Sequence, residues 1–177
     1  MLTLRPLAML PILVLPTLAP AQETAEYQVT LSEDIAAAPA DVWAVIGDFQ
    51  DMSWHPAVVA TEGEGGSEPG ATRVLTVGQV GGPTISETLE DYDAGAMTYA
   101  YTITETPPEV LPVSDYSSRI TVMAADGGGS TVEWSGTFKR YDTSAEPAEG
   151  QTDDAATAAA TAVYQAGLEA LAAKFGG

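Results

Sequence analysis

The chain has 177 residues, no cysteine and one histidine, and its 25 acidic residues against 6 lysines and arginines give a formal net charge of −19. At about 100–200 residues per domain, this length predicts a single domain. The negative charge argues against binding to nucleic acid or to an anionic membrane surface, because both attract basic faces. The lack of cysteine excludes thiol catalysis, thiolate metal sites and disulfides, and a lone histidine excludes sites that need two imidazoles. We expect no metal and no cofactor.

The first 21 residues have the layout of a secretory signal. Arg5 precedes an apolar stretch from Leu7 to Leu18, and a small-x-small ending follows at Ala19-Pro20-Ala21. We therefore expect cleavage before Gln22 and a periplasmic or secreted protein. A membrane anchor is the alternative, but the apolar stretch is shorter than the ~20 residues of a membrane span and contains two prolines. Residues 22–177 would then form one domain with no membrane anchor.

The predicted elements begin with a strand from Tyr27 to Leu31, where apolar and polar residues alternate. Pro39 starts a short helix that ends near Gly47. A second short helical turn is expected at 52–56. Alternating residues then predict six strands, at about 57–62, 71–77, 84–92, 96–105, 115–124 and 130–141.

The last predicted element is a long helix. An acidic linker over about 142–152 leads into an alanine-rich stretch, 153–175, whose larger apolar residues recur at helical spacing. Consecutive strands joined by turns predict an antiparallel sheet, and therefore an α+β fold with one long helix to cover it. If the sheet curls around this helix, a largely apolar cavity remains between them.

Strand alternation places one carboxylate on an apolar face. Glu87 lies between Ile85 and Leu89 on the same side of its predicted strand, whereas Ser86 and Thr88 point the other way. A carboxylate in that position is costly unless it is paired or hydrated. We interpret Glu87 as a cavity residue that meets water, a ligand or a neighbouring hydroxyl. The alternative is that its side chain reaches solvent near the strand end.

The other predicted strands also have one apolar or aromatic face with few polar groups. Besides Glu87, the candidate ligand-binding residues on these faces are Tyr99, Tyr101, Tyr116, Ser118 and Trp134. We expect the hydroxyls of Tyr101, Tyr116 and Ser118 to donate hydrogen bonds to the Glu87 carboxylate, directly or through water. Alternation places Arg119 on the opposite, polar face, where it would pair with surface carboxylates.

His55 is the side chain whose ordinary pKa is nearest to neutral pH, and it stands between Trp54 and Pro56 where the short helices lead into the sheet. We expect His55 and Trp54 at the rim of the cavity. For His55, a loop histidine held by backbone hydrogen bonds is favoured over a catalytic role, and for Trp54 the alternative is plain packing. No residue is assigned as catalytic.

Five short motifs together resemble a known superfamily. They are Asp41-Val-Trp-Ala-Val-Ile-Gly-Asp-Phe49, Trp54-His-Pro56, Glu87-Thr-Leu-Glu90, Leu111-Pro-Val-Ser-Asp-Tyr-Ser-Ser118 and Val132-Glu-Trp-Ser-Gly-Thr-Phe138. Their order resembles the START/Bet v 1-like (SRPBCC) superfamily, within it the polyketide-cyclase/dehydrase-like group, and most closely its secreted MxaD-like branch. The resemblance covers about 27–175. It implies a helix-grip fold, a seven-stranded antiparallel sheet wrapped around a long C-terminal helix with an internal cavity.

The plant hormone receptors of this superfamily suggest roles for single residues. Their cavity glutamate stands in a Ser/Thr-Glu-x-Leu strand, which Ser86-Glu87-Thr88-Leu89 resembles, and their Asn-Tyr-x-Ser strand is similar to Asp115-Tyr116-Ser117-Ser118. By the same resemblance, residues 78–83 and 110–114 would be the gate and latch loops. No basic residue stands in the strand predicted at 57–62, where those receptors hold a ligand carboxylate. Neutral, apolar ligands are therefore favoured.

Three functions remain open from the sequence. The first is a carrier or sensor that binds a small hydrophobic molecule. The second is an accessory protein for a periplasmic quinoprotein dehydrogenase and cytochrome c system, whose basic redox protein would be attracted by the acidic surface. The third is a cyclase- or dehydratase-type enzyme with Glu87 or His55 as general base. The sequence contains no recognisable nucleophile–base pair or metal cluster, which places the enzyme last.

Overall fold

The computed structural model describes residues 24–176, so the predicted signal segment lies outside the described residues. No helix in this part of the chain is long and apolar enough to cross a membrane. The elements in chain order are β1 (Tyr27–Ile35), α1 (Pro39–Ile46), β2 (Val58–Glu64), β3 (Thr72–Val77), β4 (Thr84–Asp93), β5 (Thr98–Glu105), β6 (Val113–Ala124), a 3₁₀ turn (Asp126–Gly128), β7 (Ser130–Arg140) and α2 (Asp153–Lys174). Each strand lies within a few residues of its predicted range.

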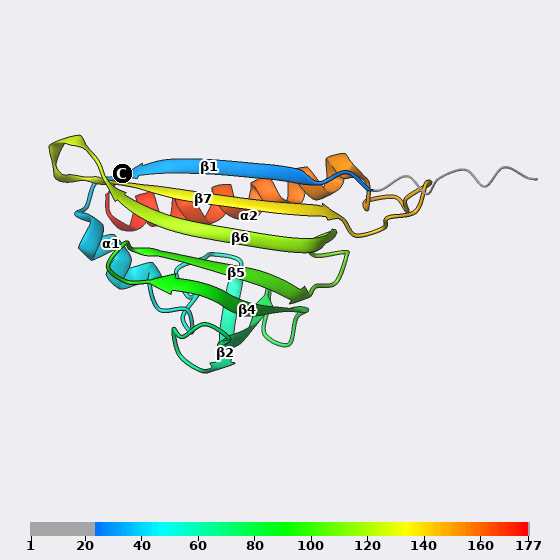
Figure 1. Cartoon of the computed structure of the whole chain (residues 1–177), viewed down its shortest axis with the longest axis horizontal. Helices are drawn as coiled ribbons and strands as arrows, with labels where there is room; N and C mark the ends of the chain where they lie inside the picture. Colours follow the sequence, from blue (N-terminus) through cyan, green and yellow to red (C-terminus); the bar gives the residue numbers. More distant parts are fainter. Residues whose placement is uncertain (1–23, 177) are drawn as a thin grey trace, which may run out of the picture.

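The seven strands form one antiparallel sheet in the order β1-β7-β6-β5-β4-β3-β2. The first strand of the chain pairs with the last, with Tyr27 opposite Phe138 and Ile35 opposite Ser130. In Figure 1, β1, β7 and β6 run along α2, and the sheet then bends away through β5 and β4 to β2. Helix α2 contacts β1 and β7. The predicted α+β helix-grip fold, with its seven-stranded antiparallel sheet, is confirmed.

Between residue 24 and β2 there is one short helix, not two. Helix α1 begins with Pro39 in its first turn and buries Val42 and Ile46. The expected second helical turn at 52–56 is instead a run of turns. The carboxylates of Asp48 and Asp51 accept the backbone N–H groups two residues further on, at 2.9 and 2.8 Å. Such local bonds favour turns over a continued helix because they engage the backbone donors first.

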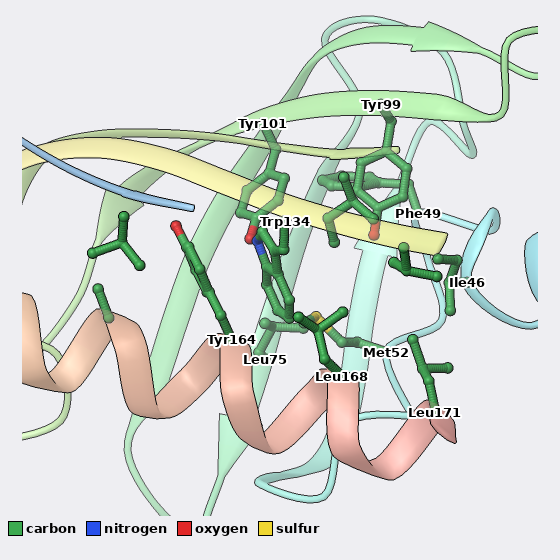
Figure 2. Packing of buried hydrophobic residues seen from close by; sticks show 14 of the residues in the cluster. Ile46, Phe49, Met52, Leu75, Tyr99, Tyr101, Trp134, Tyr164, Leu168 and Leu171 are labelled. Atoms are coloured by element: carbon green, nitrogen blue, oxygen red, sulfur yellow. The ribbon is translucent and has the colours of Figure 1, made fainter. Parts of the chain in front are cut away.

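Two glycines let α2 lie close to the sheet. A Cβ added at Gly136, on β7, would collide with the Tyr164 hydroxyl of α2. A Cβ added at Gly167, on α2, would lie 2.7 Å from His55 Cδ2 and 2.8 Å from Trp134 Cζ3. Between these two glycines the rings of Trp134 and Tyr164 stack, with centroids 4.6 Å apart and planes at 13° (Figure 2).

The inner face of the sheet carries the core. On β4 the side chains of Ile85, Glu87 and Leu89 are buried, whereas Ser86 and Thr88 are half-buried on the other face. Figure 2 shows the aromatic side chains of β5 and β7 between the sheet and the apolar residues of α2, which include Leu168 and Leu171. The strand alternation in the sequence therefore predicted the buried face correctly.

Candidate ligand-binding cavity

A cavity of about 580 Å³, partly open to the surface, lies between the inner face of the sheet and α2. Its walls come from the segment before β2, from β2 to β7, and from Val163 of α2. Most of the lining is aliphatic or aromatic, and it consists of Met52, His55, Ala57, Val58, Leu75, Val77, Gly78, Gln79, Pro83, Ile85, Glu87, Tyr101, Ile103, Val110, Leu111, Tyr116, Trp134 and Val163. A concave, mostly apolar site with a few polar groups is typical of a small-molecule site.

Glu87 is the charged residue of this lining, and its partner is Arg73. The two residues lie directly opposite each other on β4 and β3. Arg73 Nε donates to Glu87 Oε2 at 2.6 Å, and the side chains are 0% and 4% exposed. Because both charges are buried, their desolvation must be offset by this contact and by further hydrogen bonds.

The Arg73 guanidinium is fixed on several sides. Its Nη1 donates to the backbone oxygen of Phe49 at 2.8 Å. The Phe49 ring lies 4.2 Å from the guanidinium carbon, and the Tyr101 ring lies 5.3 Å from it. Such cation–π contacts favour a charged guanidinium away from water. Arg73 is therefore an immobilised cation behind the cavity wall and is absent from the lining.

The environment shifts the pKa values of both members of the pair. Burial raises the pKa of the Glu87 carboxyl, and the neighbouring Arg73 guanidinium opposes that rise. Burial is the largest single influence on the pKa of Arg73 and lowers it, but the Glu87 carboxylate together with Tyr99 and Tyr101 raises that pKa above its ordinary value. Arg73 thus stays protonated, and its short contact with Glu87 is a charge-assisted hydrogen bond.

The predicted direct hydrogen bonds from Tyr101, Tyr116 and Ser118 to Glu87 are wrong, because the partner of the carboxylate among the described residues is Arg73. The Tyr116 hydroxyl lies 2.6 Å from the Tyr164 hydroxyl of α2. Ser118 Oγ accepts from Trp134 Nε1 at 2.9 Å and donates to the Ser135 backbone oxygen at 2.8 Å. These hydroxyls are satisfied within a buried network between β6, β7 and α2, which leaves Arg73 as the partner of Glu87.

Tyr101 differs from the other two hydroxyl residues. It lines the cavity beside Glu87, and its hydroxyl has no hydrogen-bond partner among the described residues. Burial, and secondarily the Glu87 carboxylate, raise the pKa of this hydroxyl well above its ordinary value. Tyr101 therefore offers the cavity a neutral hydroxyl that can donate or accept.

His55 lines the cavity but is held by the backbone. Its Nε2 lies 3.0 Å from the Val163 carbonyl oxygen, and the Ala57 N–H donates to its Nδ1 at 3.2 Å. A carbonyl can only accept, so Nε2 carries the proton and Nδ1 is the acceptor of a neutral ring. Burial lowers the pKa of His55, which agrees with this neutral form. His55 is therefore a loop histidine held by backbone hydrogen bonds, which is the alternative that the sequence favoured over a catalytic role.

Three other candidate residues lie outside the cavity lining. Trp54 packs against the rings of His55 and Trp134, with centroids 5.9 and 5.7 Å apart. Tyr99 is buried against Phe49, deeper in the core, and Ser118 belongs to the network around Tyr164. Glu87, Tyr101, Tyr116, Trp134 and His55 do line the cavity. Ligand binding by these residues stays a prediction.

Arg119 lies on the outer face of the sheet, as alternation predicted. Its Nη2 donates to Asp91 Oδ2 at 2.9 Å, and the two side chains are 43% and 56% exposed. The basic residue that sequence reasoning missed is Arg73. The signal was present, because Arg73 alternates in phase with Leu75 and Val77, which line the cavity.

Two loops frame the cavity at the ends of β3 and β5. Gly78, Gln79 and Pro83 of the β3–β4 loop line it, together with Val110 and Leu111 of the β5–β6 loop. These are the segments that the resemblance assigns to gate and latch. Gly78 has a φ of 78°, a conformation that glycine adopts without strain.

Comparison with known proteins identifies the family. The model of a family described as polyketide cyclase/dehydrase and lipid transport matches residues 26–176. The chain belongs to this family and has the SRPBCC-type fold. No curated protein matches the chain.

Several solved structures are similar to this chain. The protein XoxI from Bacillus cereus is 32% identical with a TM-score of 0.71, over 84% of this chain and 94% of that one. A protein from Bacillus thuringiensis is 31% identical with a TM-score of 0.71, over 84% of this chain and 98% of that one. A protein from Nitrosospira multiformis is 25% identical with a TM-score of 0.68, over 84% and 96% of the two chains. The fold is thus shared over nearly the full length of each neighbour.

Proposed function

We propose that this member of the polyketide cyclase/dehydrase and lipid transport family binds a small, largely apolar molecule in its internal cavity. The observation that carries the proposal is the cavity itself, which has about 580 Å³ enclosed mainly by aliphatic and aromatic side chains. Transfer of an apolar ligand from water into such a site is favourable by roughly 25 cal/mol per Å² of buried surface. Glu87 and Tyr101 supply polar groups that can fix the orientation of the ligand.

The test is a fluorescence titration of the purified protein with N-phenyl-1-naphthylamine, a neutral apolar reporter. We expect saturable binding to the wild-type protein and an affinity lowered by about tenfold or more in Ile85→Trp, whose larger side chain fills the cavity. Met123→Trp is the matched control, because Met123 lies on the outer face of β6 and is 42% exposed. Equal affinities for the two tryptophan variants would contradict binding in the cavity.

A second candidate function, an accessory role for a periplasmic quinoprotein dehydrogenase and cytochrome c system, is favoured by the net charge of −19. Four of the 6 basic residues are engaged in ion pairs with acidic partners, so the 25 acidic residues dominate the charge. Such a surface speeds encounter with a basic protein. If it serves this role, association with a basic cytochrome c should weaken steeply from low salt to ~150 mM, where the Debye length is ~8 Å.

Export to the periplasm or to the medium belongs to the same proposal. N-terminal sequencing of protein from an extracytoplasmic fraction should give a chain that starts at Gln22, and a start at Met1 would contradict it.

A cyclase- or dehydratase-type activity remains the third candidate. In the described structure the His55 Nδ1 lone pair accepts from Ala57, and Oε2 of the Glu87 carboxylate accepts from Arg73.

A further inference from the structure

The two oxygens of the Glu87 carboxylate have different surroundings. Oε2 accepts from Arg73 Nε at 2.6 Å, and Oε1 has no hydrogen-bond partner among residues 24–176. Glu87 is a lining residue of the cavity, whereas Arg73 is not. A ligand in the cavity therefore meets the carboxylate and not the guanidinium that neutralises it.

Arg73 cannot turn toward the cavity without losing its fixed contacts. Nε is bound to Glu87 and Nη1 to the Phe49 carbonyl, and the guanidinium lies over the Phe49 ring. The side chain is also completely buried. The Arg73 guanidinium therefore holds the Glu87 side chain in one orientation.

We propose that Arg73 is a positioning residue that makes Glu87 a hydrogen-bond acceptor in the cavity, so that the preferred ligands are apolar molecules with a hydroxyl group and not carboxylates. This inference rests on the proposed function and specifies its ligand class. A ligand hydroxyl would donate to Glu87 Oε1, and Tyr101 is placed beside it as a second polar contact. A ligand carboxylate would bring a second negative charge against the buried Glu87 carboxylate in a mostly apolar site, which is strongly unfavourable.

The test compares 1-decanol with decanoate, two probes with the same chain length and different end groups. Each competes with N-phenyl-1-naphthylamine for the purified protein at pH 7.5. A hydrogen bond to a charged acceptor contributes about 1.5–3 kcal/mol, so we expect the wild-type protein to favour decanol by roughly tenfold or more. Equal affinities, or a preference for decanoate, would overturn the inference.

The deciding variant is Glu87→Gln. Its amide oxygen can keep the bond from Arg73 Nε, and its NH₂ group then faces the cavity as a donor. We expect the preference for decanol to shrink by about tenfold or to reverse, while the reporter still binds. Arg119→Gln, which removes an outer-face arginine from its pair with Asp91, is the control and should leave the ratio unchanged.

Arg73→Lys separates positioning from charge. Lysine keeps the positive charge but has no planar guanidinium that can donate to Glu87 and to the Phe49 carbonyl at the same time. We expect weaker decanol binding with reporter binding retained, and an unchanged decanol affinity would overturn the positioning role. If this variant does not fold, the Glu87→Gln comparison still decides the ligand class. If the reporter fails to bind the wild-type protein, the proposed function itself fails and the inference with it.

Discussion

Arg73 and Glu87 face each other from neighbouring strands, and their 2.6 Å contact joins two side chains that are almost completely buried. In a buried pair of this kind, one charge is tolerable only because the other is present. The energetic cost of disturbing it therefore depends on whether one partner or both are replaced.

We expect Glu87→Leu to destabilise the protein by about 3–5 kcal/mol, because it leaves the Arg73 guanidinium buried without its counter-ion. The double variant Arg73→Met with Glu87→Leu should recover most of this loss, since no unpaired charge remains. Urea unfolding of the single and double variants measures both values. A stable Glu87→Leu protein would show that the contact is not needed for the fold.

The exposed pair Arg119–Asp91 supplies the matched control. Asp91→Leu should change the free energy of unfolding by less than about 1 kcal/mol, because exposed ion pairs contribute little. If Asp91→Leu lowered the free energy of unfolding as much as Glu87→Leu does, burial would not determine the energetic cost of removing one partner of an ion pair.

Gly136 tests how closely α2 lies against β7. Gly136→Ala should lower stability, because its Cβ would collide with the Tyr164 hydroxyl. Tyr164→Phe removes that oxygen, so the alanine should be less damaging in the Tyr164→Phe background. Thermal denaturation of the wild type, the two single variants and the double variant gives the coupling free energy between residues 136 and 164. Strictly additive effects would contradict the close contact.

At Gly167 we expect the opposite change in stability from the one that helix propensity predicts. In an exposed helix interior, glycine to alanine stabilises by about 1 kcal/mol. At Gly167 the new methyl group would press on the rings of His55 and Trp134, so we expect Gly167→Ala to be destabilising. The reverse change at exposed Ala162, Ala162→Gly, calibrates propensity in the same helix. A more stable Gly167→Ala protein would refute the tight packing.

His55 should make stability depend on pH below neutrality. Burial lowers its pKa in the folded protein, so between that value and the ordinary value of about 6.5 the unfolded chain binds more protons. The contribution of neutral His55 is complete above pH about 6.5 and is lost as the pH falls. The melting temperature of wild type should therefore drop more between pH 7.5 and 5.5 than that of His55→Gln. Parallel curves would show that His55 does not titrate with unfolding.

The sequence predicted the fold well because the alternation on each strand was clean. Ile85, Glu87 and Leu89 were assigned to the buried face from their spacing alone, and the structure buries all three. The pairing of Glu87 was not predictable in the same way. It depends on the register that sets Arg73 opposite Glu87, and alternation within a strand does not specify register between strands.

The hydroxyl residues show a second limit. Tyr116 and Ser118 share the inner face with Glu87, but a bond needs distance and direction as well as a shared face. Their partners come from α2 and β7, which are remote in sequence, and Gly136 creates the space that the Tyr164 hydroxyl occupies. The turns after α1 are a further case, because the Asp48 and Asp51 side chains engage local backbone donors there.

The central claim is that the cavity holds a small apolar ligand, and methyl-resolved NMR during titration with N-phenyl-1-naphthylamine tests it most directly. We predict saturable shifts of the Leu75, Ile85 and Leu111 methyl signals, which come from three walls of the cavity. The methyl signals of exposed Val59 and Val74 should stay in place. Shifts confined to Val59 and Val74, or no saturable shift at the three cavity residues, would contradict the account.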